Sequence, residues 1–261
     1  MNEYFAEAER IRDRLPADIA LVPDRYALDQ LPPLLRERFP AERPVLAMNL
    51  QCMSHITREP APEGVLAEIP LPKMRITVEG VQRILILSSV SLPSNLGSLI
   101  RTAVALGWTV GVTGDYTDPF SYDAIRYSKG AVLHQPLIRL EHGELRHMRN
   151  TFSFLLATPA PLKRFEPFPP EFLPNGIRIS RPVSMLKRKI ALVVGNESHG
   201  LTDFPMKASG IDVTIPLTEG CKLDSLNVAV AGGIILHTLT SLSLDGRVKR
   251  GETMKEKERA T

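Results

Sequence analysis

The first segment whose residues could do chemistry runs from Asn95 to Arg101 and follows the apolar run at 83–90. Asn95 is a good helix cap, and Gly97 permits close approach of a neighbouring backbone. Arg101 lies in a helical pattern whose neighbouring residues are mostly apolar. A guanidinium in such surroundings needs a carboxylate or phosphate partner, and the simpler alternative is a solvated surface arginine.

The second segment is the loop from Gly195 to Gly200, which follows a strongly apolar run. The two glycines bracket Asn196 and Glu197. Such a loop can present backbone N–H and C=O groups to a ligand, and it can hold the Glu197 carboxylate beside the Arg101 guanidinium. The alternative is an ordinary strand-to-helix turn with a capping glutamate.

The third segment contains Ile215-Pro216 and, further along, Ser225 and Asn227. Serine and asparagine suit the N-terminus of the apolar helix that is expected at 226–239. The free N–H groups and the positive dipole end of a helix favour polar or anionic ligand groups. Ordinary capping without a ligand is the alternative.

Other common site signatures are missing from the sequence. It has no G-x-G-x-x-G after its first strand and no G-x-x-x-x-G-K-[ST], so an enzyme that uses a dinucleotide or a nucleoside triphosphate is disfavoured. His142 and His147 lack the H-E-x-x-H pattern, so we expect solvated helix histidines and no metal site. The three polar segments remain the candidates for a binding site.

The elements expected around these segments alternate between strand and helix. Short apolar runs predict strands buried on both faces, and the pattern at 96–107 predicts a helix that ends at its glycine. Strands separated by helices form a parallel sheet covered on both faces, and such α/β sheets bind ligands at the carboxyl ends of their strands. The strands of this sheet are expected at 83–90, 109–113, 153–158, 190–195 and 213–216.

A small α/β domain is expected before this sheet, over residues 1–78, and the main domain over 79–244. The proline-rich stretch at 160–188 is expected to be a long loop or insertion, and the charged tail at 245–261 to be flexible. In the small domain, the sequence predicts helices at 3–15 and 28–39 and strands at 19–22, 45–49 and 65–69.

The composition is that of an ordinary globular protein. Of the 261 residues, 43% are hydrophobic and 23% are charged, and no apolar run approaches the roughly 20 residues of a membrane span. Cys52 and Cys221 form neither a disulfide framework nor a metal-binding spacing, which favours a reducing compartment. The acidic start is unlike a secretory or mitochondrial leader. A formal net charge of +3 permits binding to RNA without requiring it.

Taken together and in this order, the three segments resemble the motifs of the SpoU (TrmH-like) family of SPOUT RNA 2′-O-ribose methyltransferases. The family's motifs are N-x-G-x-x-x-R-x-A, then G-x-E-x-x-G, then I-P followed by S-L-N-V. Between the first two, the family often carries D-P and R-x-S-x-G-A. This chain matches all of them in order, at 95–103, 118–119, 126–131, 195–200, 215–216 and 225–228.

The resemblance implies an α/β fold, with a parallel sheet flanked by helices and a C-terminal trefoil knot (the SPOUT fold). It also implies S-adenosylmethionine as cofactor and a site completed across a homodimer. Residues 54–67 are similar to the end of the L30e-like RNA-binding domain that often precedes SpoU domains. Residues 1–18 are shorter than the usual start of that domain, so a truncated or divergent L30e-like domain is expected.

Roles for individual residues also follow from the resemblance. Arg101 would hold the phosphate next to the reacting ribose and stabilise the developing oxyanion, because a guanidinium stays protonated in proteins and cannot serve as a base. Glu197 would orient Arg101, and Asn95, Ser225 and Asn227 would position the nucleotide and the loop. The residues expected to hold S-adenosylmethionine are Thr158, Pro159, Gly195, Asn196, Gly200, Ile215, Leu217 and Leu226.

The resulting prediction is an enzyme that methylates a ribose 2′-hydroxyl in large-subunit rRNA, since L30e-like domains commonly accompany rRNA enzymes. A tRNA 2′-O-methyltransferase is the nearest alternative, and a catalytically silent ribosome-assembly or RNA-binding factor of the same fold is the second. We expect RNA and a second copy of the chain as partners, with no membrane and no metal. The expected location is the cytoplasm, or the mitochondrial matrix in a eukaryote.

Overall fold

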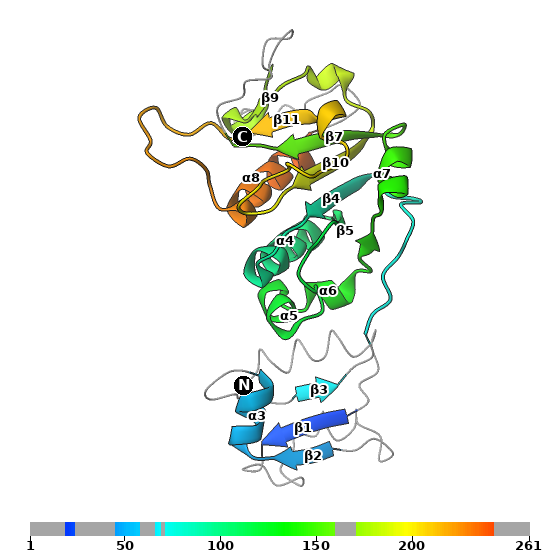
Figure 1. The fold of residues 1–261 in the computed structure, drawn as a ribbon, viewed down its shortest axis with the longest axis vertical. Coiled ribbons are helices and arrows are strands. Elements are labelled where there is room, and N and C mark those ends of the chain that lie inside the picture. Colours follow the sequence, from blue (N-terminus) through cyan, green and yellow to red (C-terminus); the bar gives the residue numbers. More distant parts are fainter. Residues whose placement is uncertain (1–18, 24–44, 58–65, 69–70, 160–170, 243–261) are drawn as a thin grey trace, which may run out of the picture. The chain divides into compact units, whose positions relative to one another are not determined.

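The computed structural model of the chain describes residues 19–23, 45–57, 66–68, 71–159 and 171–242 (Figure 1). The chain divides into two compact units, Met1–Lys73 and Met74–Thr261. Each unit has its own β-sheet. The site described below lies in the second unit.

The first unit contains a small sheet of three strands. β1 (Ile19–Pro23) lies between β2 (Val45–Met48), to which it is parallel, and β3 (Leu66–Glu68), to which it is antiparallel. α3 (Leu50–Thr57) follows β2, and the Asn49 side chain caps it by accepting a backbone hydrogen bond at 2.8 Å. A helix that directly follows a strand in the chain gives this unit its α/β character.

These three strands lie where the sequence predicted them. Helix α3 was not predicted, because its eight residues span little more than two turns and give a weak periodic signal. The helices predicted at 3–15 and 28–39 lie outside the described residues, as does the tail at 245–261.

The second unit is built on an eight-stranded sheet in the order β6-β5-β4-β10-β7-β11-β9-β8. The first six strands in this order are parallel, and β9 and β8 extend the sheet in antiparallel fashion beyond β11. The strands are β4 (Arg83–Ser88), β5 (Thr109–Thr113), β6 (Ile138–Arg139), β7 (Phe152–Ala157), β8 (Glu171–Phe172), β9 (Arg178–Ile179), β10 (Lys189–Val194) and β11 (Ile211–Thr214).

β10 lies between β4 and β7, although it follows both of them in the chain (Figure 1). Leu192 is in register with Leu85 of β4 and with Leu155 of β7. The three strands are parallel, so their carboxyl ends open on the same edge of the sheet. The loops that follow them therefore meet at that edge.

The described part of the second unit also contains five α-helices. They are α4 (Pro93–Ala105), α5 (Tyr122–Ser128), α6 (Ala131–His134), α7 (His142–Met148) and α8 (Val228–Ser241). The helix predicted at 96–107 is confirmed, and the one predicted at 226–239 is confirmed with a start at Val228. α7 carries His142 and His147, which were expected to be helix histidines. α5 and α6 were not predicted, because neither exceeds seven residues, which is less than two turns.

Both faces of the sheet are buried, which explains the continuous apolar runs of its strands. In β4, Leu85 and Leu87 join the core that contains α4 and α8. Ile84 and Ile86 point to the opposite face and join the core that contains α7. The predicted fold class, an α/β sheet flanked by helices, is therefore confirmed for this unit.

The proline-rich stretch that was predicted to be a long loop has regular structure where it is described. β8 and β9 form a hairpin there, and β9 pairs with β11. Leu173, Ile177 and Ile179 of this hairpin are buried in the main core. The prediction of a plain loop is wrong over this part, because strands of two residues are too short to show an alternating pattern.

Across the described ranges, every helix is too short or too polar to cross a lipid bilayer.

Gly97 marks a close approach of α4 and α5, and this contact can be tested. A Cβ at residue 97 would lie 2.7 Å from the Ala124 carbonyl oxygen and 2.8 Å from the Ser128 nitrogen. We expect Gly97→Ala to lower the free energy of unfolding by about 1–3 kcal/mol, the range for overpacking, despite the better helix propensity of alanine. Urea unfolding measures the change.

Gly143→Ala is the matched control for this variant. Gly143 also lies in a helix, but a Cβ there would meet nothing within 4 Å. We expect this variant to be as stable as the wild type or slightly more stable, because alanine is the better helix former. Equal free energies of unfolding for the two variants would contradict the tight α4–α5 contact.

Candidate active site

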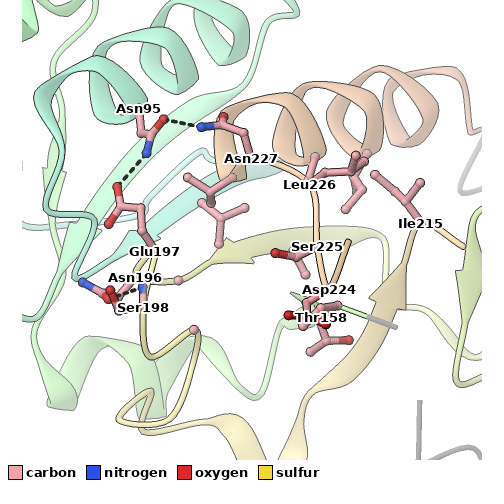
Figure 2. A pocket seen from close by; sticks show the side chains of 18 of the residues that line it. Asn95, Thr158, Asn196, Glu197, Ser198, Ile215, Asp224, Ser225, Leu226 and Asn227 are labelled. Carbon is pink, nitrogen blue, oxygen red and sulfur yellow. Dashed lines mark hydrogen bonds between the residues drawn. The ribbon is translucent and has the colours of Figure 1, made fainter. Parts of the chain in front are cut away.

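A pocket of about 490 Å³ opens at the carboxyl ends of β7, β10 and β11, beside the N-terminus of α8 (Figure 2). Its volume is in the range of sites for small ligands. The wall combines loop backbone, apolar side chains and a few polar groups. The lining residues are Leu92, Asn95, Ala157, Thr158, Pro159, Val194, Gly195, Asn196, Glu197, Ser198, Gly200, Ile215, Leu217, Asp224, Ser225, Leu226, Asn227, Val228, Ala231 and Ile235.

One wall of the pocket is backbone that leaves no room for a side chain. The Asn196 N–H donates to the Gly200 carbonyl at 3.0 Å, and the Gly200 N–H donates back at 2.9 Å, so the loop closes on itself. A Cβ at Gly195 would collide with the Gly200 carbonyl group, and Gly200 has a φ of +60°. Both glycines of the second segment are therefore required by the shape of the loop.

The Glu197 carboxylate binds the N-terminal turn of α4. Its Oε2 accepts hydrogen bonds from the Ser91 N–H at 3.2 Å and from the Ser91 hydroxyl at 2.8 Å. Its Oε1 accepts from the Leu92 N–H at 3.2 Å and from the Asn95 amide at 2.8 Å. The N-cap residue Leu92 has no side-chain oxygen, so a distant glutamate caps the helix and places its charge at the positive dipole end.

The carboxylate fixes the orientation of two amides, because it can only accept hydrogen bonds (Figure 2). Asn95 must turn its Nδ2 toward Glu197, so its Oδ1 accepts from Asn227 Nδ2 at 3.0 Å. Asn227 then uses its Oδ1 to accept from the N–H groups of Ala229 and Val230 at 2.8 and 3.3 Å. These bonds run from the loop after β10 through α4 to the N-terminus of α8.

Asn227 lies at the N-terminus of α8, as predicted, and is its N-cap residue. Ser225 has a different place from the predicted one, because the helix begins at Val228 and Ser225 lies two residues before the cap. Its side chain lines the pocket instead. The expectation that Ser225 belongs to the helix N-terminus is wrong, since Asn227 has the non-helical backbone of a cap and the helical turns start after it.

Arg101 is the predicted site residue that does not line the pocket. It is exposed on α4, and the Glu197 carboxylate is occupied by the N-terminal turn of that helix. Six residues correspond to about 600° of helical rotation, so Arg101 and Asn95 lie on different sides of α4. The expectation that Arg101 is buried beside Glu197 within one chain is therefore wrong.

All other predicted site residues line the pocket, although their roles remain a proposal. Figure 2 shows Asn95, Glu197 and Asn227 together at one end and Thr158, Asp224 and Ser225 toward the other. The predicted residues that line it are Asn95, Thr158, Pro159, Gly195, Asn196, Glu197, Gly200, Ile215, Leu217, Ser225, Leu226 and Asn227.

Three polar residues of the site were not predicted, and one of them is Ser198, which lines the pocket. Ser91 donates two hydrogen bonds to Glu197, and Asp224 lines the pocket. Each lies in or near a predicted segment, since Asp224 precedes Ser225, Ser198 follows Glu197, and Ser91 lies four residues before Asn95. Their position next to these segments was the available signal.

The hydrogen bonds at Glu197 also determine its charge. Partial burial by itself raises the pKa of this carboxyl group. The hydrogen bonds from Asn95, from backbone N–H groups and from Ser91 outweigh that effect, and the pKa lies below its ordinary value. The side chain is therefore an ionised acceptor at neutral pH.

The described residues contain no group of three or more His, Cys, Asp or Glu side chains arranged to hold a metal ion. His142 and His147 are exposed on α7. Cys52 and Cys221 are exposed and free. The polar side chains that line the pocket are amides, hydroxyls and carboxylates.

The family model described as SpoU rRNA Methylase matches residues 82–237, which is more than half of the chain and includes all three polar segments. The chain belongs to this family.

Relatives of this SpoU chain are found in several bacteria. The 23S rRNA (guanosine(2553)-2′-O)-methyltransferase RlmP of Bacillus subtilis (strain 168) is 24% identical over 91% of this chain and 88% of its own length. An uncharacterized tRNA/rRNA methyltransferase of Mycobacterium bovis is 31% identical over 68% of this chain and 59% of its own length. The 23S rRNA (adenosine(1067)-2′-O)-methyltransferase of Streptomyces azureus is 27% identical over 59% of this chain and 52% of its own length.

Solved structures share the fold of this SpoU chain. The SpoU methyltransferase AviRb from Streptomyces viridochromogenes, in complex with AdoMet, superposes with a TM-score of 0.67 at 23% identity, over 93% of this chain and 88% of that one. An AdoMet-bound rRNA methyltransferase from Sinorhizobium meliloti superposes with a TM-score of 0.66 at 24% identity, over 91% of this chain and 86% of that one. At these identities the likeness establishes the fold alone.

The lowered pKa of Glu197 predicts how acid affects this SpoU fold. A carboxyl group with a lowered folded-state pKa contributes stability above its unfolded pKa, and that stability is lost as the pH falls through the folded pKa. Below about pH 4, we expect the wild type to lose stability more steeply than Glu197→Gln, whose amide does not titrate. Thermal unfolding at a series of pH values measures both. A stability difference that stays constant down to acid would contradict the ionised carboxylate.

Asn227→Asp separates the two roles of Asn227. Aspartate caps a helix as well as asparagine does, but it cannot donate to Asn95 Oδ1. The buried Asn95 would lose a partner, so we expect a loss of about 1–3 kcal/mol in the free energy of unfolding. Asn227→Ala should lose roughly 1 kcal/mol more, because the cap is also removed. Wild-type stability of Asn227→Asp in urea unfolding would contradict the proposed chain of amides.

Proposed function

We propose that this chain is an S-adenosylmethionine-dependent RNA methyltransferase that modifies a ribose 2′-hydroxyl in large-subunit rRNA. The observation that carries the proposal is the pocket at the carboxyl ends of the central strands, whose wall contains the second and third SpoU segments. The relatives from B. subtilis and S. azureus are named 23S rRNA 2′-O-methyltransferases, which supports rRNA as the substrate.

The residues of the pocket fit S-adenosylmethionine. The tight backbone at Gly195 offers a flat wall, and Ile215, Leu217 and Leu226 offer apolar surface that would hold the adenine. Thr158 would face the polar parts of the molecule. When bound, S-adenosylmethionine supplies a methyl group on a sulfonium. The protein would exclude water and hold the acceptor ribose in line with that group.

The acceptor hydroxyl must lose a proton as the new oxygen–carbon bond forms and the carbon–sulfur bond breaks. Arg101 cannot take this proton, because a guanidinium remains protonated in proteins. We assign Arg101 to bind the neighbouring phosphate and to stabilise negative charge on the 2′-oxygen. The proton would pass to that phosphate or to water.

Arg101 would serve the pocket of a second copy of the chain. Arg101 and Asn95 lie on different sides of α4, so Arg101 does not point into the pocket of its own chain. The adjoining helix α8 exposes Val230 and Ile234, which are 52% and 37% accessible and one helical turn apart. We propose that this apolar strip belongs to a homodimer interface that brings Arg101 to the second copy's site.

We also propose a domain organisation, a C-terminal knot and a cellular location for the enzyme. Residues 1–78 would be a truncated or divergent L30e-like RNA-binding domain, followed by the methyltransferase domain at 79–244 and a charged tail at 245–261. The methyltransferase domain would carry the C-terminal trefoil knot of the SPOUT fold. The enzyme would act where its rRNA is assembled, in the cytoplasm or in the mitochondrial matrix of a eukaryote.

Arg101→Ala tests the catalytic assignment. The purified protein would be incubated with radiolabelled S-adenosylmethionine and with total RNA from cells that lack this protein. We expect label in large-subunit rRNA with the wild type and a loss of about 100-fold or more with Arg101→Ala, the size expected for removal of an oxyanion-stabilising group. The dissociation constant of S-adenosylmethionine, measured by calorimetry, should be unchanged.

Arg146→Ala is the matched control, because Arg146 is also an exposed helix arginine but lies on α7. It should keep wild-type activity. Full activity of Arg101→Ala would contradict the assignment of Arg101, and label in the tRNA fraction would favour a tRNA enzyme. No label and no cofactor binding with the wild type would favour a catalytically silent assembly factor.

A further inference from the structure

The segment that contains the β8–β9 hairpin concentrates positive charge. Residues 171–189 carry five basic side chains and one acidic one, while the whole chain has a formal net charge of only +3. The acidic residue, Glu171, is exposed, and its carboxylate accepts a hydrogen bond from the Val183 N–H at 2.7 Å. Lys187, just before β10, donates to the Arg149 carbonyl, and Lys189, at the start of β10, lies over the Phe152 ring. Arg178 and Arg181 are therefore the basic residues of the segment in or next to the hairpin.

An exposed aromatic ring lies within this positive segment. Phe172 of β8 is 61% accessible and is in register with Arg178 of β9. The Arg178 Cζ lies 5.5 Å from the centre of the Phe172 ring. A guanidinium at this distance from a ring makes a cation–π contact, so the two side chains form one amphipathic surface.

The hairpin is anchored, although this pair of side chains is exposed. Leu173 and Ile177, which flank the turn, and Ile179 are buried in the core. Asn175 in the turn donates a hydrogen bond to the Thr238 hydroxyl of α8 at 3.1 Å. Core packing therefore explains the hairpin but not the exposed Phe172 ring. A surface held in place in this way loses little conformational entropy when a ligand binds.

A row of neighbouring residues connects the pair to the pocket. Arg178 is in register with Thr214 of β11, and β9 lies beside β11 (Figure 1). The Thr214 hydroxyl donates to the carbonyl of Thr158, which lines the pocket, at 2.6 Å. Neighbouring strands are about 4.8 Å apart, so Phe172 lies roughly 15 Å, three strand spacings, from Thr158 in the pocket wall.

We propose that Phe172 and Arg178 form a platform on which an unpaired base of the RNA substrate stacks, a few nucleotides from the methylated ribose. Unpaired bases stack on aromatic rings and on guanidinium planes, and the basic side chains of Arg178 and Arg181, in and just after β9, would attract the phosphates. The Arg178 guanidinium over the ring favours RNA over an apolar protein partner. The inference rests on the proposed RNA substrate and adds a contact outside the pocket.

Phe172→Ala in the full-length protein tests the platform. We expect the affinity for a short fluorescein-labelled single-stranded RNA, measured by anisotropy, to fall by about 10-fold, since stacking on an aromatic ring is lost. The KM for rRNA should rise by a similar factor, and the dissociation constant of S-adenosylmethionine should not change. Phe172→Trp should bind RNA like the wild type.

Met185→Ala is the matched control, because Met185 is 54% accessible in the same segment but has no ring. It should leave RNA affinity unchanged. Wild-type affinity in Phe172→Ala, equal weakening by Met185→Ala, or no RNA binding by the wild type would each overturn the platform. Failure of the proposed function is separate, because it would appear as a wild-type protein that neither binds S-adenosylmethionine nor methylates rRNA.

Discussion

The Glu197 carboxylate orders the site because it accepts hydrogen bonds and cannot donate them. Four donors from Ser91, Leu92 and Asn95 converge on it and close the first turn of α4, whose own N-cap is a leucine. The carboxylate sets the orientation of the Asn95 amide, and Asn95 sets that of Asn227, which is 132 positions further along the chain. The three SpoU segments are thereby joined, and the loss of one group leaves another unpaired.

The position of β10 in the sheet makes this network possible. β10 lies between β4 and β7 with all three strands parallel, so the loop after β10 emerges between α4 and the end of β7. The loop must then turn back within a few residues, and the contact between Gly195 and Gly200 leaves no space for side chains. The position of β10, the tight loop that follows it and the contact of Glu197 with α4 therefore depend on one another.

The charged side chains of the pocket lining are acidic, and the basic side chains lie outside the pocket. The pocket lining contains two carboxylates, Glu197 and Asp224, and neither lysine nor arginine. Such a lining suits a cofactor that carries a sulfonium and an ammonium group, but it does not attract a phosphate backbone. In the proposed enzyme, attraction for RNA would come from outside the pocket, from Arg101 of a second copy and from Arg178 and Arg181.

The sequence by itself determined the main strands, the two long helices and the polar N-terminus of α8, because apolar spacing and capping chemistry depend on residues a few positions apart. It also indicated most of the residues that line the pocket, since parallel strands must bring their carboxyl ends to one edge. Only the tertiary structure decided that Glu197 bonds to the start of α4 and not to Arg101, and that β8 and β9 extend the sheet. The Glu197 bonds join residues more than 100 positions apart, and the β9–β11 pairing joins strands that are not neighbours in the chain; local sequence patterns specify neither.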